Sequence, residues 1–274
     1  MFSGFAGSMG SNQTDFGEQM INTVASQSIR RMFSQCDSMD VDIRCVPSSK
    51  LLQGSIDSFK MKGKGLVIKR QFQVDEMSFE TDAIAVDFGS VLRGQIRLKQ
   101  PTQAIAQVML SEDGINRAFN AELVKKRLDQ VSLSTVEIAG IDTPISFVEI
   151  SVKLLSVNQI EIHAKADVPG QGLIPIAVKT TLAVERRRKL LFTEPQFQDE
   201  LVPTEAHALS KQLTAEFVAI LNNMVDLDRF DLDGVEMRIN RLEIQPQGLL
   251  FSGYAQIDHF QGANFRQLRT ILGQ

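Results

Sequence analysis

The sequence predicts an α+β fold in which an antiparallel β-meander is covered on its apolar face by long amphipathic helices. Within the segments of Val148 to Val184, almost every even-numbered residue is apolar, whereas many odd-numbered positions are polar or charged. Because side chains alternate between the two faces of a strand, this pattern predicts three strands with one apolar face. The connections at 155–158 and 169–172 are short and rich in turn-forming residues, which permits antiparallel hairpins and excludes parallel crossovers.

Residues 1–14 are mostly small or polar, and we expect them to be a flexible lead. Helical periodicity predicts a first helix over residues 15–35. Thr14 or Asp15 can cap the N-terminus of this helix. The apolar residues recur at steps of three and four, as on one face of a helix. They include Met20, Val24, Met32 and Phe33.

Short alternating segments from Val41 to Leu110 predict further strands, with turns at 47–49, 63–65 and 101–102. Ser111, followed by two acidic residues, is typical of a helix N-cap and predicts a second helix that ends near Leu128.

The meander continues through the basic turn 186–189 to Phe197, and Pro203 and Thr204 open a third helix that ends near 225. A last hairpin follows, in which the apolar positions change from odd to even and predict a β-bulge near Asn240 and Arg241. We expect one elongated domain over residues 15–260 and a short polar tail over 261–274. The apolar stripe of the third helix includes Leu213, Phe217, Leu221 and Met224.

The composition narrows the function classes. The chain has 274 residues, a net charge of -4, 17 Phe, one Tyr and no Trp. Its length allows a sizeable core, and its charge gives no general attraction to nucleic acid. Sugar sites usually stack ligands on Trp or Tyr, so the aromatic bias argues against a carbohydrate-binding module.

The N-terminal sequence lacks the basic start and apolar run of a secretory signal, and no apolar stretch approaches the length of a membrane span. We therefore expect a cytoplasmic protein that contacts a membrane at most from its periphery. Cys36 and Cys45 are too few for a disulfide framework. Two free thiols are the simpler interpretation, and a disulfide between them is the alternative.

No motif for catalysis, nucleotide binding or metal binding is present. The three histidines, His163, His207 and His259, are far apart and lack a second ligand at metal-binding spacing. The acidic run 226–234 does not have the spacing of a calcium loop. The sequence therefore predicts no enzyme, no metal and no cofactor.

A run of four basic residues forms the strongest charge feature. Such a turn can contact lipid phosphates or an anionic membrane surface, or it can be a solvated hairpin tip that protects a sheet edge. Its members are Arg186, Arg187, Arg188 and Lys189.

Three diffuse motifs resemble the LmeA-like phospholipid-binding family, which is common in actinobacteria and cyanobacteria. They are Leu51-Leu52-x-Gly54, the segment Leu110 to Asn116, and a closing pattern that includes Leu242-x-Ile244-x-Pro246-x-Gly248-Leu249 and Gly253-x-Ala255. The resemblance covers roughly residues 18–258. It implies a tubular lipid-binding fold, with a strongly curved sheet wrapped around a long helix and an apolar groove for acyl chains. No catalytic residue is carried over, and the signal or anchor of exported members is not present.

The leading hypothesis is non-catalytic binding or carriage of phospholipid in a groove between sheet and helices. The alternatives are a structural or protein-interaction module with a closed core, and an enzyme that acts on a lipid or glycan. An apolar groove beneath the helix 204–225 would favour the first. The candidate lining residues are Met20, Val24, Met32, Phe33, Leu213, Phe217, Leu221, Met224, Ile162 and Ile176.

Overall fold

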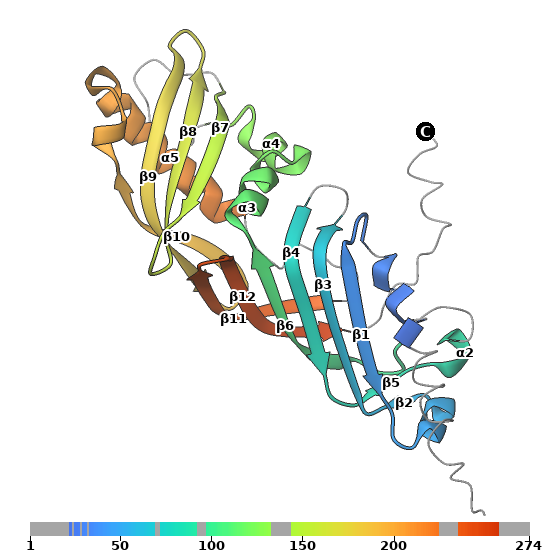
Figure 1. Ribbon diagram of the computed structural model, residues 1–274. Coiled ribbons are helices and arrows are strands. Elements are labelled where there is room, and N and C mark those ends of the chain that lie inside the picture. The colour runs from blue at the N-terminus through green and yellow to red at the C-terminus, as the bar shows by residue number, and fades with distance from the viewer. Residues whose placement is uncertain are drawn as a thin grey trace, which may run out of the picture.

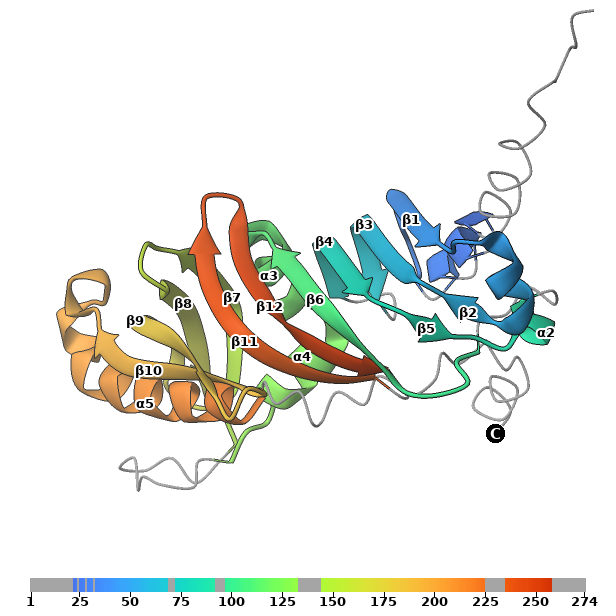
Figure 2. The ribbon, with the colours of Figure 1, turned by 90° about the horizontal axis from the view of Figure 1, so that it is seen from below.

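Two antiparallel sheets lie side by side and give the molecule an elongated shape (Figures 1 and 2). The computed structural model describes residues 22–23, 25–27, 29–31, 33–68, 72–91, 97–132, 144–224 and 235–257. Within this part neither sheet closes into a barrel. The predicted lead 1–14 and tail 261–274 lie outside the described residues.

The larger sheet has six strands in the order β1-β3-β4-β6-β12-β11. Four of these strands come from the first half of the chain, and the closing hairpin adds β12 beside β6. The strands are β1 (Ser38–Arg44), β3 (Ser58–Ile68), β4 (Phe72–Thr81), β6 (Thr102–Leu110), β11 (Val235–Gln245) and β12 (Gly248–Ile257). Next to them lie the short pair β2 (Ser55–Ile56) and β5 (Ile84–Ala85), and the short helices η1 (Ser48–Gln53) and α2 (Phe88–Val91).

The smaller sheet has four strands in the order β10-β9-β8-β7. Its strands are β7 (Ser146–Leu154), β8 (Gln159–Val168), β9 (Gly172–Glu185) and β10 (Lys189–Phe197), so the predicted meander and its turns are confirmed. Helix α5 (His207–Met224) lies against β9 and β10, after the short turns η2 (Asp199–Leu201) and η3 (Thr204–Ala206). Helices α3 (Glu112–Phe119) and α4 (Glu122–Leu128) lie between the sheets, where α3 contacts both β4 and β7 (Figure 1).

The prediction of several long covering helices is wrong. In the described part of the first predicted helix, helical residues occur only within 22–30. The second predicted helix is broken into α3 and α4. The break occurs because Asn120 bonds back to the carbonyl of Asn116 and Ala121 takes an extended conformation with its side chain buried. Such local side-chain bonds compete with helix continuation. Only α5, with 18 residues, forms a long cover in the described part.

The sequence also predicted a turn at 63–65 and a β-bulge near Asn240 and Arg241. The predicted turn at 63–65 is wrong, because β3 continues through it in unchanged register with β4, with Gly65 at a φ of 58° inside the strand. The bulge predicted near Asn240 and Arg241 is confirmed by a register shift between Ile239 and Arg241.

Two clusters of buried side chains form the cores. The first core lies between α5 and the four-stranded sheet and extends to Leu242 and Leu249 of the closing hairpin. Phe147 and Phe217 meet at its centre with ring centroids 4.9 Å apart. The second core lies on β1 and β3, where Ala25 and Ile29 of the N-terminal helical segment pack.

An asparagine side chain caps each edge strand of the two larger sheets. Its amide has both donors and an acceptor, so it can bond to an edge peptide as a neighbouring strand would. Asn116 of α3 exchanges two bonds with Val152 of β7, at 2.9 and 2.7 Å, and Asn222 of α5 does the same with Phe192 of β10, at 3.2 and 2.7 Å. The other two caps are Asn158 on Leu242 and Ile244 of β11, and Asn22 on Ile43 of β1.

Replacement of Asn222 by alanine is expected to lower the free energy of unfolding by roughly 1–3 kcal/mol, because both backbone groups of Phe192 lose their partner at a partly buried site. Urea unfolding measures the change. The control is Gln212→Ala, which removes a similar amide from an exposed position on the same helix. Equal stability of the two variants would refute the capping role.

Candidate functional site

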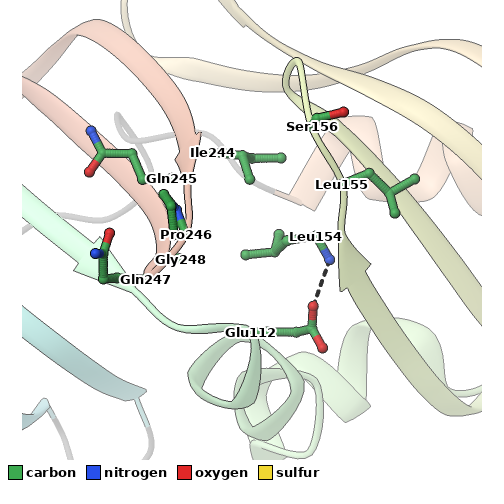
Figure 3. Close-up of a pocket in the computed structure, with 9 residues that line it drawn as sticks. All are labelled: Glu112, Leu154, Leu155, Ser156, Ile244, Gln245, Pro246, Gln247 and Gly248. Carbon is green, nitrogen blue, oxygen red and sulfur yellow. Dashed lines mark hydrogen bonds between the residues drawn. The ribbon is translucent and has the colours of Figure 1, made fainter.

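A cavity of about 390 Å³ lies at the seam between the two sheets. One wall is the end of β7 with the β7–β8 turn, and the opposite wall is the β11–β12 turn (Figure 3). The start of α3 forms the floor. The lining residues of this seam cavity are Glu112, Leu154, Leu155, Ser156, Ile244, Gln245, Pro246, Gln247 and Gly248.

Three backbone-directed bonds hold the walls in place. Asn158, in the β7–β8 turn, donates to the carbonyl of Leu242 and accepts from the amide of Ile244, both at 3.0 Å, and so fastens the turn to β11. Glu112 accepts from the amide of Leu154 at 2.8 Å and fixes the end of β7 to α3. The α3 N-terminus is itself capped by Ser111, whose hydroxyl accepts from Gly114 at 3.1 Å, as the sequence predicts.

The seam cavity is lined by both apolar and polar side chains. Leu154 and Ile244 point towards its middle from opposite walls, whereas Leu155 points away (Figure 3). Both Leu154 and Ile244 also pack against the first core. The cavity therefore borders the first core, while Glu112, Ser156 and the two glutamines add polar groups to its lining.

An apolar row leads across the six-stranded sheet on the same face as Ile244. Met77, Val108, Phe251 and Leu242 lie directly opposite one another on β4, β6, β12 and β11. The first three are only half-buried. Phe251 packs against the first core and Met77 against the second, so this row bridges the two closed cores.

The structure separates the residues that the sequence nominated for a groove. Six of them lie together in the first core at 9% exposure or less and line no part of the seam cavity. Phe33 packs against the second core instead, and Met20, Val24 and Met32 lie outside the described residues. The six core residues are Leu213, Phe217, Leu221, Met224, Ile162 and Ile176.

The sequence reasoning missed the residues that line the seam cavity. Ile244, Pro246 and Gly248 stand in the closing motif of the family resemblance, which could have drawn attention to them. The sequence around Leu154 showed only the alternation of apolar and polar residues that is typical of a strand. No local signal indicates that these two segments meet.

The basic run 186–189 is the β9–β10 turn and continues into the first residue of β10. It docks against the closing hairpin, since the carbonyl of Arg187 accepts from the amide of Ile239 at 2.6 Å. The Arg187 side chain bonds to Asn240 and lies over the ring of Tyr254, 5.9 Å from its centroid. The turn therefore attaches one sheet to the other as well as presenting charge.

Three carboxyl groups outside the seam cavity have a pKa that is lowered by structural partners. A hydrogen bond from the amide of Val46, then one from Lys50, holds the pKa of Asp57 below its usual value. Lys64 lowers the pKa of Glu76 and Lys126 that of Glu122. No group of metal-ligating side chains occurs within the described residues.

The other sequence candidates have ordinary surroundings. His163 contacts Glu161 at 2.7 Å and His207 contacts the carbonyl of Val202 at 2.8 Å, whereas His259 and the acidic run 226–234 lie outside the described residues.

The interpretation without a disulfide agrees with the structure. Cys36 and Cys45 are not bonded to each other, and they flank the seven-residue strand β1. That strand spans roughly 23 Å, far beyond the reach of a disulfide.

In the part of the chain that the structure describes, no helix has the length and hydropathy needed to cross a membrane. A protein-family model described as LmeA-like phospholipid-binding matches residues 13–253. No curated protein and no solved structure matches the chain.

Proposed function

Since the chain belongs to the LmeA-like phospholipid-binding family, we propose that it binds phospholipid without catalysing a reaction and holds acyl chains in the apolar region between its two sheets. The observation that carries this proposal is the match to the family model over nearly the whole chain. We propose the seam cavity as part of the binding site.

The size and lining of the seam cavity support a partial lipid site. Its volume of about 390 Å³ is at the lower end of the range for small-ligand sites. A phospholipid with two acyl chains needs more room, so we propose that the rest of the lipid lies along the apolar row on Met77, Val108 and Phe251. Each buried methylene contributes about 0.8 kcal/mol, so a chain needs no polar motif to be held.

In this proposal, the core residues that the sequence nominated would line the site beyond the seam cavity. Leu154 and Ile244 border the first core, which contains Leu213, Phe217 and Leu221 of α5. A chain that extends from the seam cavity into this core requires α5 to move away from β9 and β10. The N-terminal candidates Met20, Val24 and Met32 stay a prediction.

A second candidate function is an interaction module with a closed core. The complete burial of Leu213 and Phe217 of α5 favours it, because these side chains pack in the first core against the four-stranded sheet. The two functions differ in one measurable property, which is the presence of lipid in the folded protein.

Lipid analysis of the purified protein tests the proposal. Gentle purification, solvent extraction and mass spectrometry are expected to find phospholipid at a near-stoichiometric amount. The control is an unrelated protein of similar size, purified in parallel, which reports background lipid. A folded protein that carries no lipid above this background, and takes up none from added phospholipid, would contradict the proposal and leave the closed-core module.

A further inference from the structure

One surface of the molecule combines exposed apolar side chains with basic charge from two separate segments. It lies on the face of the six-stranded sheet opposite the apolar row. Ile105 of β6 and Tyr254 of β12 stand directly opposite each other there, at 54% and 45% exposure. Tyr254 is the chain's single tyrosine.

The centre of this surface has no formal charge. The side chains of β6 and β12 that share this face are neutral, in contrast to the next two strands, where glutamates of β4 pair with lysines of β3. Neutral strands lose little when water is removed, whereas a buried charge is costly. The residues concerned are Gln103, Ile105, Gln107 and Met109 of β6, and Leu250, Ser252, Tyr254 and Gln256 of β12.

Basic residues collect on one side of this neutral surface. The β9–β10 turn brings its four cations beside Arg238 and Arg241 of β11, because Arg187 bonds to the bulge at Ile239 and Asn240. Glu236 and Glu243 pair with the two β11 arginines. Arg186 and Lys189 have no ion pair within the described residues, so their charge is available to a ligand.

We propose that this docking face, formed by Ile105, Tyr254, Arg186, Arg187 and Lys189, binds the surface of an anionic phospholipid bilayer. The inference rests on the proposed function, since a phospholipid-binding protein must obtain its ligand from a membrane. Tyrosine suits the bilayer interface because its ring is apolar and its hydroxyl is polar. Basic side chains near an anionic surface add attraction that salt weakens.

The position of the docking face fits delivery of a lipid to the seam cavity. The two lie on opposite faces of the six-stranded sheet but share its edge strand β11, with Arg187 at Ile239 and the cavity at Ile244 to Gly248. This separation corresponds to roughly 20 Å of strand. A lipid drawn from the bilayer beside the β9–β10 turn would therefore reach the cavity by passing around the edge strand β11 to the other face of the sheet.

Fluorescence gives a direct test, because the native chain contains no tryptophan. In the variant Tyr254→Trp the emission is expected to shift to shorter wavelength when vesicles of phosphatidylcholine mixed with phosphatidylglycerol are added. The control is Leu173→Trp, an exposed position at the opposite end of β9, roughly 40 Å from the basic turn. Its emission is expected to stay unchanged. A shift at Leu173→Trp without one at Tyr254→Trp, or no shift in either, would overturn the proposal.

Vesicle sedimentation tests the charges. The double variant Arg186→Gln/Lys189→Gln is expected to bind mixed vesicles about thirty-fold more weakly, since each charge near an anionic surface contributes about a five-fold factor. The double variant Lys125→Gln/Lys211→Gln removes two exposed charges from α4 and α5 and is expected to bind as the native protein does. Equal losses in the two variants would show a general charge effect and overturn the proposal. So would tighter binding to a polyanionic nucleic acid than to the vesicles.

The test of the docking face can be distinguished from the test of the proposed function. Lipid that co-purifies with the protein is measured without vesicles. A protein that carries lipid but does not lose vesicle binding in the Arg186/Lys189 variant would refute the docking face alone. A protein that docks on vesicles through this face yet never holds lipid would refute the proposed function alone.

Discussion

Replacement of Phe217 by alanine is expected to lower the free energy of unfolding by about 3–5 kcal/mol, the usual loss for a buried phenylalanine. Phe217 is 0% exposed at the centre of the first core, and its ring contacts that of Phe147. It joins α5 to the four-stranded sheet. The variant therefore loses apolar burial, leaves a cavity and gives up a favourable ring pair.

Chemical denaturation measures the effect, with Phe197→Ala as the control. Phe197 is half-buried at the end of β10, where its ring meets His207 edge-on at 6.1 Å between centroids. Its removal is expected to cost clearly less. If the two variants lose the same stability, the first core does not depend on the packing between α5 and the sheet.

Replacement of Gly253 by alanine is expected to destabilise the protein by roughly 3–4 kcal/mol, in the range of severe packing defects. A Cβ at this position would lie 1.8 Å from the carbonyl oxygen of Arg238 on the neighbouring strand. The clash is with backbone at the bulge of β11, so relief requires β11 and β12 to separate. Because β12 also pairs with β6, the strain spreads to the centre of the six-stranded sheet.

The matched control for this variant is Gly170→Ala. Gly170 lies in the β8–β9 turn with a φ of 81° and has no atom near the position of an added Cβ. Its replacement is expected to cost only the backbone strain, on the order of 1–2 kcal/mol. Circular dichroism melts compare the two variants. A smaller loss at Gly253 than at Gly170 would show that the bulge can rearrange.

The local pattern of the sequence predicts the strands well because each strand carries its own alternation. The meander from β7 to β10 and the bulge near Asn240 follow from that pattern. The pattern fails at Glu149, where a φ of 51° and a register shift reverse the faces of β7 and turn Phe147 inward. Apolar residues on both sides of Glu149 left two possible phases, and only pairing with β8 selects one.

The helices and the site depend on contacts that no local pattern contains. Asn158 meets Leu242, 84 residues further along the chain, and this bond helps to form the seam cavity. The capping asparagines cannot be told from other polar residues in the sequence, because each caps an edge strand that is distant along the chain. Likewise, the stripe of α5 predicts burial but cannot say whether its partner is a side chain or a lipid.

The central claim, that phospholipid occupies the seam cavity, is tested most directly by filling the cavity and measuring bound lipid. The double variant Leu154→Trp/Ile244→Trp places two large side chains where the native residues point into the cavity. The control is Val157→Trp, which adds the same bulk at an 85% exposed position in the neighbouring turn. Mass spectrometry of folded proteins is expected to find phospholipid in the native protein and in the control, and several-fold less in the double variant. An unchanged lipid content in the double variant would contradict the claim.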